Sequence, residues 1–195
     1  MTVEQFVMAY GAEQDRLRAI LPDGFRSLRP VLRINAEIRD GGSGYVEFNT
    51  AAEWEGKKGW VNIGFWENVP FEKKNGVTVF CTDFLRLEFS ATGIAGGCPA
   101  EGDNVGCFFP GRGLRAPEPI GVPKEFCDCT FAWSFAQGGA RGVSIGKTLP
   151  AIPTPPARTY PRADFTVENA AVIPCSAVLG AYCVRFARTL PAVKM

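Results

Sequence analysis

The side chains that could carry chemistry in this chain are carboxylates, cysteines, tyrosines and a few lysines, because the 195 residues include no histidine. Histidine is the usual general base near neutral pH and the commonest metal ligand. Nucleophile pairs that need histidine, and zinc or haem ligation by it, are therefore excluded. An amine nucleophile remains available, and the lysines are few enough to consider singly: Lys57, Lys58, Lys73, Lys74, Lys124, Lys147 and Lys194.

Lys124 is the lysine whose position best suits an amine nucleophile. It follows the turn residues Gly121-Val122-Pro123 and precedes a predicted strand at 126–136. A side chain at that point can enter a closed sheet, although a surface turn is the alternative. The paired lysines at 57–58 and 73–74 fall in predicted hairpin loops, where we expect them to be solvated.

A second group of candidates lies on one face of three predicted strands. Alternation over 31–38, 45–50 and 60–66 gives each strand one polar row, which together contain Arg33, Asn35, Glu37, Glu47, Asn49 and Asn62. In the third strand, alternation predicts that Ile63 and Phe65 share one face and that Asn62 and Trp66 share the other. If the sheet is open, the polar rows form its solvated face; if it closes, they can line a cavity with paired carboxylates.

Four of the seven cysteines raise the question of a metal. Cys98, Cys107, Cys127 and Cys129 would supply the four thiolates of a structural zinc site, but their spacing differs from the usual Cys-x-x-Cys pairs. Buried thiols are the simpler interpretation. We therefore predict no metal and no cofactor, and keep zinc as an alternative that metal analysis would settle.

Composition indicates an ordinary globular domain. The formal net charge of +1 gives no reason to expect nucleic acid or a membrane surface as partner. The first residues do not resemble a secretory signal, and no apolar stretch is long enough to span a bilayer. We expect a cytoplasmic protein with a single domain over residues 1–195.

The elements that must position these residues are mostly strands. Thr2 and Gln5 form a capping box that predicts a short helix, and Ala12–Ile20 continues with helix-forming residues up to Pro22. After Pro22 the period changes to two, with turn signals at short spacing. Val77–Ala91 reads as one long strand, and 126–136 with 142–145 as a hairpin. We predict a mainly antiparallel β or α+β fold, barrel-like, with a short N-terminal helical segment.

Several short motifs resemble the acetoacetate decarboxylase-like superfamily. They are Leu21-Pro-Asp-Gly-Phe25, Tyr45-Val-Glu47, Gly56-Lys-Lys-Gly-Trp60 and Gly121-Val-Pro-Lys124. The resemblance implies a closed or cone-like β-barrel that forms a homo-oligomer. It also implies a lyase in which Lys124 forms a Schiff base with a small keto acid, while Glu47 is an acid of the pocket.

Under this hypothesis the polar rows supply the remaining contacts. An arginine such as Arg29 or Arg33 would bind the substrate carboxylate through its planar fork, and Glu37 could share proton handling with Glu47. Asn62 is a further candidate for substrate binding. The alternative is a non-catalytic barrel of the same fold that binds a small organic molecule without a covalent step.

Overall fold

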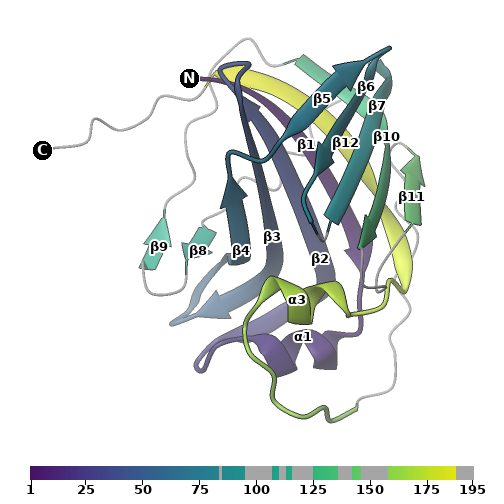
Figure 1. The fold of residues 1–195 in the computed structure, drawn as a ribbon. Helices are drawn as coiled ribbons and strands as arrows, with labels where there is room; N and C mark the ends of the chain where they lie inside the picture. The colour runs from purple at the N-terminus through teal and green to yellow at the C-terminus, as the bar shows by residue number, and fades with distance from the viewer. Residues whose placement is uncertain are drawn as a thin grey trace, which may run out of the picture.

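The computed structural model describes residues 1–83, 85–94, 107–109, 113–115, 125–135, 142–145 and 158–187. Twelve strands and two short helices make up this part of the chain (Figure 1). In chain order they are β1 (Thr2–Gly11), α1 (Gln14–Ile20), β2 (Arg26–Arg39), β3 (Ser43–Trp54), β4 (Lys57–Glu67), β5 (Phe71–Lys74), β6 (Val77–Cys81), β7 (Leu85–Ile94), β8 (Cys107–Phe109), β9 (Gly113–Arg115), β10 (Glu125–Phe135), β11 (Gly142–Ile145), α3 (Val167–Ala171) and β12 (Ala177–Ala187).

The strands form one sheet in the order β5-β6-β7-β10-β12-β1-β2-β3-β4-β8-β9, with β11 paired to β10. Within the described residues all pairs are antiparallel except β4 with β8, so the predicted mainly antiparallel fold is confirmed. The predicted hairpin of β10 and β11 is also confirmed. The segment predicted as one long strand is instead two, β6 and β7, because the chain turns at Thr82, whose N–H bonds the carbonyl of Leu85.

The predicted closed barrel is not found in the described part of the chain. The sheet curls strongly, but its end strands β5 and β9 do not pair. Other contacts connect segments that the curled sheet brings close together. Lys73 of β5 forms an ion pair with Glu4 of β1, and the N–H of Val69 donates a hydrogen bond to the carbonyl of Gly44 at 3.0 Å. The described residues therefore form a curled open sheet.

The helix predicted to begin at Thr2 is wrong, because Thr2–Gly11 forms the central strand β1. Pairing on both sides, with β12 and with β2, outweighs the local capping signal. Both faces of β1 are covered, since Phe6 and Met8 lie in the main core while Val3 and Val7 lie in a second apolar cluster. The helical prediction over 12–20 is confirmed by α1, which ends before Pro22.

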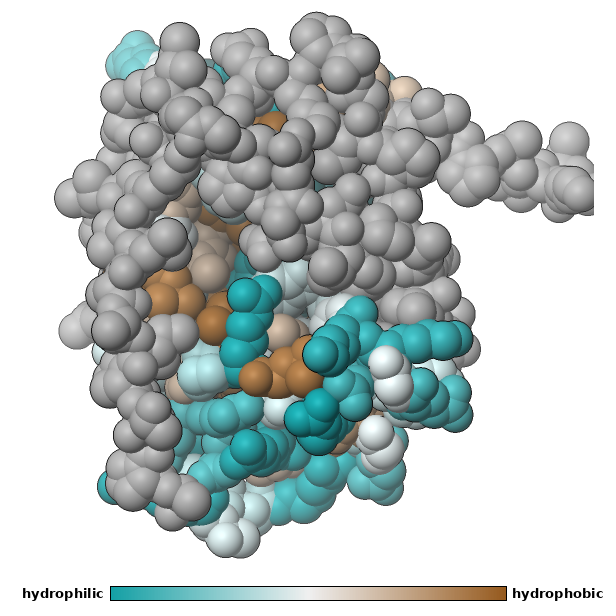
Figure 2. All heavy atoms as spheres, turned by 180° about the vertical axis from the view of Figure 1, so that it is seen from behind, coloured by the Kyte–Doolittle hydropathy of each residue, from teal (hydrophilic) through white to brown (hydrophobic). Residues whose placement is uncertain are grey.

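The main core occupies one face of the sheet, closed at one end by α1 and α3, which lie together in Figure 1. Rings of Phe6, Phe80 and Phe89 pack together there, with centroids 6.4 Å apart for Phe6 and Phe80 and 5.8 Å apart for Phe80 and Phe89. From behind, hydrophilic side chains predominate at the lower end of the molecule (Figure 2). No helix in the described residues has the length and hydropathy needed to cross a membrane.

Candidate functional site

The polar rows of β2, β3 and β4 lie side by side on the face opposite the main core. Register pairs Asn35 with Glu47 between β2 and β3, and Asn49 with Asn62 between β3 and β4. These side chains are buried, with exposed fractions of 4% for Asn35, 8% for Glu47, 0% for Asn49 and 2% for Asn62. These four side chains are therefore not solvated, and this part of the polar face is an interior one.

A β-bulge brings Asn62 onto this face. The register of β3 and β4 shifts between Phe48 and Asn49, so that Ile63 is the extra residue. Without the shift, Asn49 would pair with Ile63, and Asn62 would point to the main core. The bulge also reverses the predicted alternation beyond it, because Phe65 now shares the polar face and Trp66 packs against the core.

Glu47 is the centre of the site, and both of its carboxylate oxygens accept two hydrogen bonds. Oε1 accepts from the amides of Asn35 at 2.9 Å and Asn49 at 3.1 Å. Oε2 accepts from the hydroxyl of Tyr45 at 2.6 Å and the amide of Asn62 at 2.9 Å. A carboxylate has about four acceptor positions, so this set of neutral donors satisfies the ionised group fully. We refer to Glu47 and these four donors as the carboxylate cage.

The amide orientations in the cage follow from the chemistry of Glu47. A carboxylate only accepts, so each asparagine must present its NH2 group, which turns its own carbonyl oxygen away. Among the described residues, the buried Oδ1 atoms of Asn35 and Asn49 have no hydrogen-bond partner. The cage therefore offers unused acceptors next to its satisfied carboxylate.

A second buried carboxylate, Glu37, lies beside the cage. Its exposed fraction is 1%, and it accepts from the amide of Gln5 at 3.0 Å and from Nε of Arg39 at 2.8 Å. The guanidinium of Arg39 also lies 3.8 Å from the ring centroid of Tyr45. The two carboxylates predicted to face one cavity are thus on the same face, linked through Arg39 and Tyr45.

The two candidate arginines gather at the other end of the polar face, around Trp60. Carbon Cζ of Arg33 lies 4.0 Å from the Trp60 ring centroid, and that of Arg29 lies 4.8 Å from it. Arg29 is exposed, whereas Arg33 is half-buried, and within the described residues its Nε makes no hydrogen bond. Stacking on indole fixes the plane of a guanidinium and leaves its edge available for a carboxylate.

Burial and the neighbouring charge act together on Tyr45. Desolvation raises the pKa of its phenol well above the usual value near 10, and the carboxylate of Glu47, which accepts its hydrogen bond, raises it further. Tyr45 therefore remains a hydrogen-bond donor throughout the neutral range. Its hydroxyl and the amides hold Glu47 in one orientation.

Comparison with solved structures decides the fold. Acetoacetate decarboxylase from Legionella pneumophila superposes with a TM-score of 0.57 at 11% identity, over 98% of this chain and 83% of that one. Another acetoacetate decarboxylase structure gives 0.53 at 8% identity, over 99% and 89%. This chain has the acetoacetate decarboxylase-like fold.

The same fold occurs in other enzymes. The enduracididine biosynthesis enzyme MppR, complexed with pyruvate, gives a TM-score of 0.50 at 12% identity, over 97% of this chain and 86% of that one. No protein-family model and no curated protein matches the sequence. At such low identities the likeness establishes the acetoacetate decarboxylase-like fold and leaves activity to be argued from the residues.

Within this fold, the structure brings together most of the residues that the sequence singled out. Glu47, Glu37, Asn62 and Arg33 share the buried face, while Arg29 lies at its exposed rim. Lys124 lies outside the described residues, directly before β10. The side chains of the four cysteines proposed for zinc are likewise not described, and the described residues contain no cluster of potential metal ligands.

Sequence reasoning missed three contributors to the site: Gln5, Arg39 and Trp60. Gln5 was assigned to a helix, so its contact with Glu37 could not be expected. Arg39 lies two residues after Glu37, so strand alternation places both on one face of β2. This pattern could have identified Arg39 as a partner of Glu37. Alternation places Trp60 on the same face as Asn62. The arginines that stack on Trp60 could not be predicted, because they depend on the register of β2, β3 and β4.

Proposed function

We propose that this chain is a lyase-type enzyme that decarboxylates a small keto acid through a Schiff base on Lys124. The observation that carries the proposal is the carboxylate cage, a buried and fully hydrogen-bonded Glu47 inside an acetoacetate decarboxylase-like fold. Such an interior charge is costly to bury and serves little purpose in a sheet that only needs to pack. A cationic intermediate next to it would use that charge.

The register of β10 supports the placement of Lys124. Phe126 of β10 pairs with Val184, which pairs with Gln5, the residue that contacts Glu37. If the alternation extends back along the strand, position 124 has the same parity as Phe126 and falls on the polar face. In this proposal Glu125 has the opposite parity, opposite Arg185, and so does not share the face of Lys124.

A nucleophilic lysine must be neutral, and the polar face offers a cause. A neighbouring cation and burial both disfavour the ammonium form of an amine and so lower its pKa. The nucleophilic lysine of acetoacetate decarboxylase is a known example. Burial on the polar face would thus help to keep Lys124 nucleophilic in our proposal.

The proposed reaction balances without a cofactor. The amine of Lys124 adds to the ketone and water leaves, forming an iminium. In a β-keto acid, the bond between the carboxylate and the carbon next to the iminium carbon then breaks, carbon dioxide departs, and the electron pair moves to the iminium nitrogen to give an enamine. Protonation at carbon and hydrolysis release the ketone and regenerate the amine.

Roles for the other residues follow from their hydrogen bonds. Because all acceptor positions of Glu47 are occupied, we assign it as a fixed negative charge that stabilises the iminium, and assign proton handling to Glu37. Arg33, held on Trp60, would bind the substrate carboxylate, with Arg29 at the rim. Asn62 would then act through Glu47, as a positioning residue.

Borohydride trapping tests the proposal. The protein is incubated with pyruvate or acetoacetate, reduced, and mapped by peptide mass spectrometry, alongside the variants Lys124→Ala and Lys58→Ala. We expect an adduct on Lys124 that Lys124→Ala abolishes and Lys58→Ala leaves unchanged, because Lys58 lies in an exposed hairpin. Binding of keto acids with no adduct would instead support the non-covalent alternative and overturn the Schiff base.

A further inference from the structure

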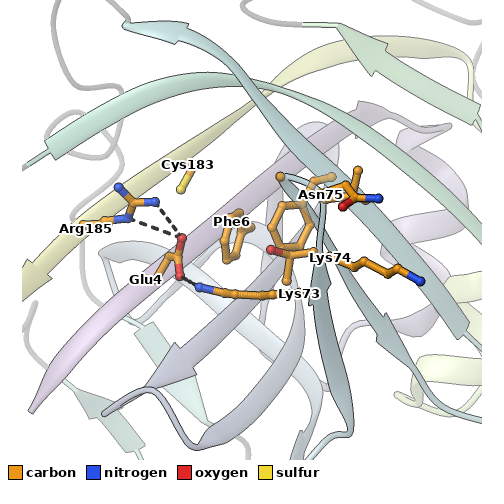
Figure 3. A pocket seen from close by; sticks show the side chains of 11 residues that line it. Glu4, Phe6, Lys73, Lys74, Asn75, Cys183 and Arg185 are labelled. Carbon is orange, nitrogen blue, oxygen red and sulfur yellow. Dashed lines mark hydrogen bonds and ion pairs between the residues drawn. The ribbon is translucent and has the colours of Figure 1, made fainter.

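A pocket of about 290 Å³ lies on the face of β1 opposite to the one that carries Gln5 (Figure 3). Its wall includes Glu4 and Phe6 from β1, Lys73 from the β5–β6 hairpin, and Cys183 and Arg185 from β12. Because consecutive residues of a strand point to opposite faces, Glu4 opens onto this pocket while Gln5 contacts Glu37. None of the described residues proposed for the lyase reaction lines it.

The inner part of the pocket is aromatic. Phe6 and Phe89 have exposed fractions of 3% and 2%, and both belong to the main core. Cys183 and Thr78, also buried, complete this inner part. Such a surface accepts an apolar group of a ligand and gives little to a hydrated ion.

The rim is charged and has an excess of cations. Glu4 accepts from Nη2 of Arg185 at 3.1 Å and also forms an ion pair with Lys73, so one carboxylate is shared by two cations (Figure 3). Lys74 adds a third cation to the lining. A lysine ammonium has three donors, and Glu4 engages one of those of Lys73.

The hairpin residues explain why a pocket forms here. Along β5, Phe71 pairs with Phe80 and fills the core, but the next residue of the same parity is Lys73, which pairs with Thr78. On the core-facing side of β5, an aromatic residue, Phe71, is therefore followed two residues later by a cationic one, Lys73. The side chain of Lys73 is 48% exposed, so its ammonium is accessible at the mouth.

We propose that this pocket binds a small organic carboxylate with an apolar or aromatic body. The body lies on Phe6 and Phe89, and the carboxylate binds the ammonium of Lys73 in competition with Glu4. This site is separate from the proposed lyase site and does not depend on it. Its ligand needs no keto group and forms no covalent bond.

Because Glu4 competes with the ligand for Lys73, the proposal predicts opposite changes in affinity when Lys73 and Glu4 are replaced. Benzoate is the probe, its neutral analogue benzamide is the ligand control, and binding is measured by saturation-transfer NMR and titration calorimetry. We expect Lys73→Met to weaken benzoate binding by about tenfold, the loss of one charge-assisted contact. Glu4→Gln should strengthen it, because the competing carboxylate is gone. Lys58→Met, in the other hairpin, should leave it unchanged.

A control variant on the opposite face separates this pocket from the keto-acid site. Arg33→Met should not alter benzoate affinity if the probe binds beside Lys73. The proposal is overturned if wild-type protein binds benzoate no better than benzamide, if Glu4→Gln weakens binding, or if Arg33→Met removes it. Should Lys73→Met fail to fold, the sign of the Glu4→Gln effect still decides.

Discussion

Glu47 is held by donors from three strands, Asn35 from β2, Tyr45 and Asn49 from β3 and Asn62 from β4. Every donor is neutral, so the buried carboxylate is satisfied by hydrogen bonds without an ion pair. A salt bridge would cancel the field that an incoming cation experiences. The cage is thus suited to binding a positively charged intermediate and needs no cation of its own.

Replacing Glu47 by Gln should destabilise the protein even though the shape is kept. The new NH2 group would face either the NH2 groups of Asn35 and Asn49 or the Tyr45 hydroxyl and the NH2 group of Asn62, so that donors oppose donors unless these groups reorient away from their present partners. We expect a loss of about 1–3 kcal/mol in the free energy of unfolding, measured by urea denaturation. The matched control is Glu53→Gln, which breaks an ion pair with the exposed Arg26 and should cost less than about 1 kcal/mol. Equal losses in both variants would contradict the cage.

Tyr45 should make the stability depend on pH at the alkaline end. Its phenol has a raised pKa in the folded protein, so the unfolded chain releases that proton first, from about pH 10 upward. The contribution of Tyr45 to the free energy of unfolding is complete below about pH 10. Above that pH it falls by up to about 1.4 kcal/mol per pH unit. Tyr45→Phe should be less stable than wild type at pH 8, and the gap should narrow toward pH 11 in urea denaturation. Parallel pH curves would rule out this role for Tyr45.

At the scale of elements, sequence patterns predicted most strands but could not supply the register between them. Alternation placed Glu47 and Asn49 on one face correctly, because a strand with one polar row repeats every two residues. The capping signal at Thr2 failed because β1 is covered on both faces, and its apolar residues therefore do not alternate with polar ones. The Ile63 bulge left no signal in the alternation, so the face of Phe65 was assigned wrongly.

Gly44 ties the start of β3 to the segment before β5, where the curled sheet meets itself. A Cβ at Gly44 would lie 2.1 Å from the carbonyl oxygen of Val69, and backbone cannot move aside as a side chain can. Gly44→Ala should therefore cost more than about 2 kcal/mol in thermal or urea unfolding. Gly42→Ala is the matched control two residues away, since a Cβ there meets nothing within 4 Å. If the two variants are equally stable, the close approach of these segments is wrong.

At the scale of the whole molecule, one sheet carries two buried faces with different chemistry. The main core and the pocket beside Lys73 lie on one face of the sheet. The carboxylate cage around Glu47 lies on the other. The fold could be anticipated because short motifs and strand alternation agreed on it. The position of Lys124 relative to the cage depends on tertiary placement, which local patterns do not encode.

We expect the protein to form a homo-oligomer, as the resemblance to acetoacetate decarboxylase-like proteins implies. Two large apolar side chains are open to solvent in the described chain, Phe65 at 37% and Val172 at 59%, and an interface could cover them. Light scattering coupled to size exclusion should give a multiple of the 21.1 kDa chain mass. A monomer across the micromolar range would remove this expectation.

The central claim is that Lys124 forms an iminium on the face that holds Glu47. The most direct measurement is a peptide map of the protein after reduction with borohydride in the presence of pyruvate. The proposed function requires a single reduced adduct on Lys124, with the exposed pairs Lys57–Lys58 and Lys73–Lys74 unmodified. An unmodified Lys124, or an adduct spread over the exposed lysines, would contradict it.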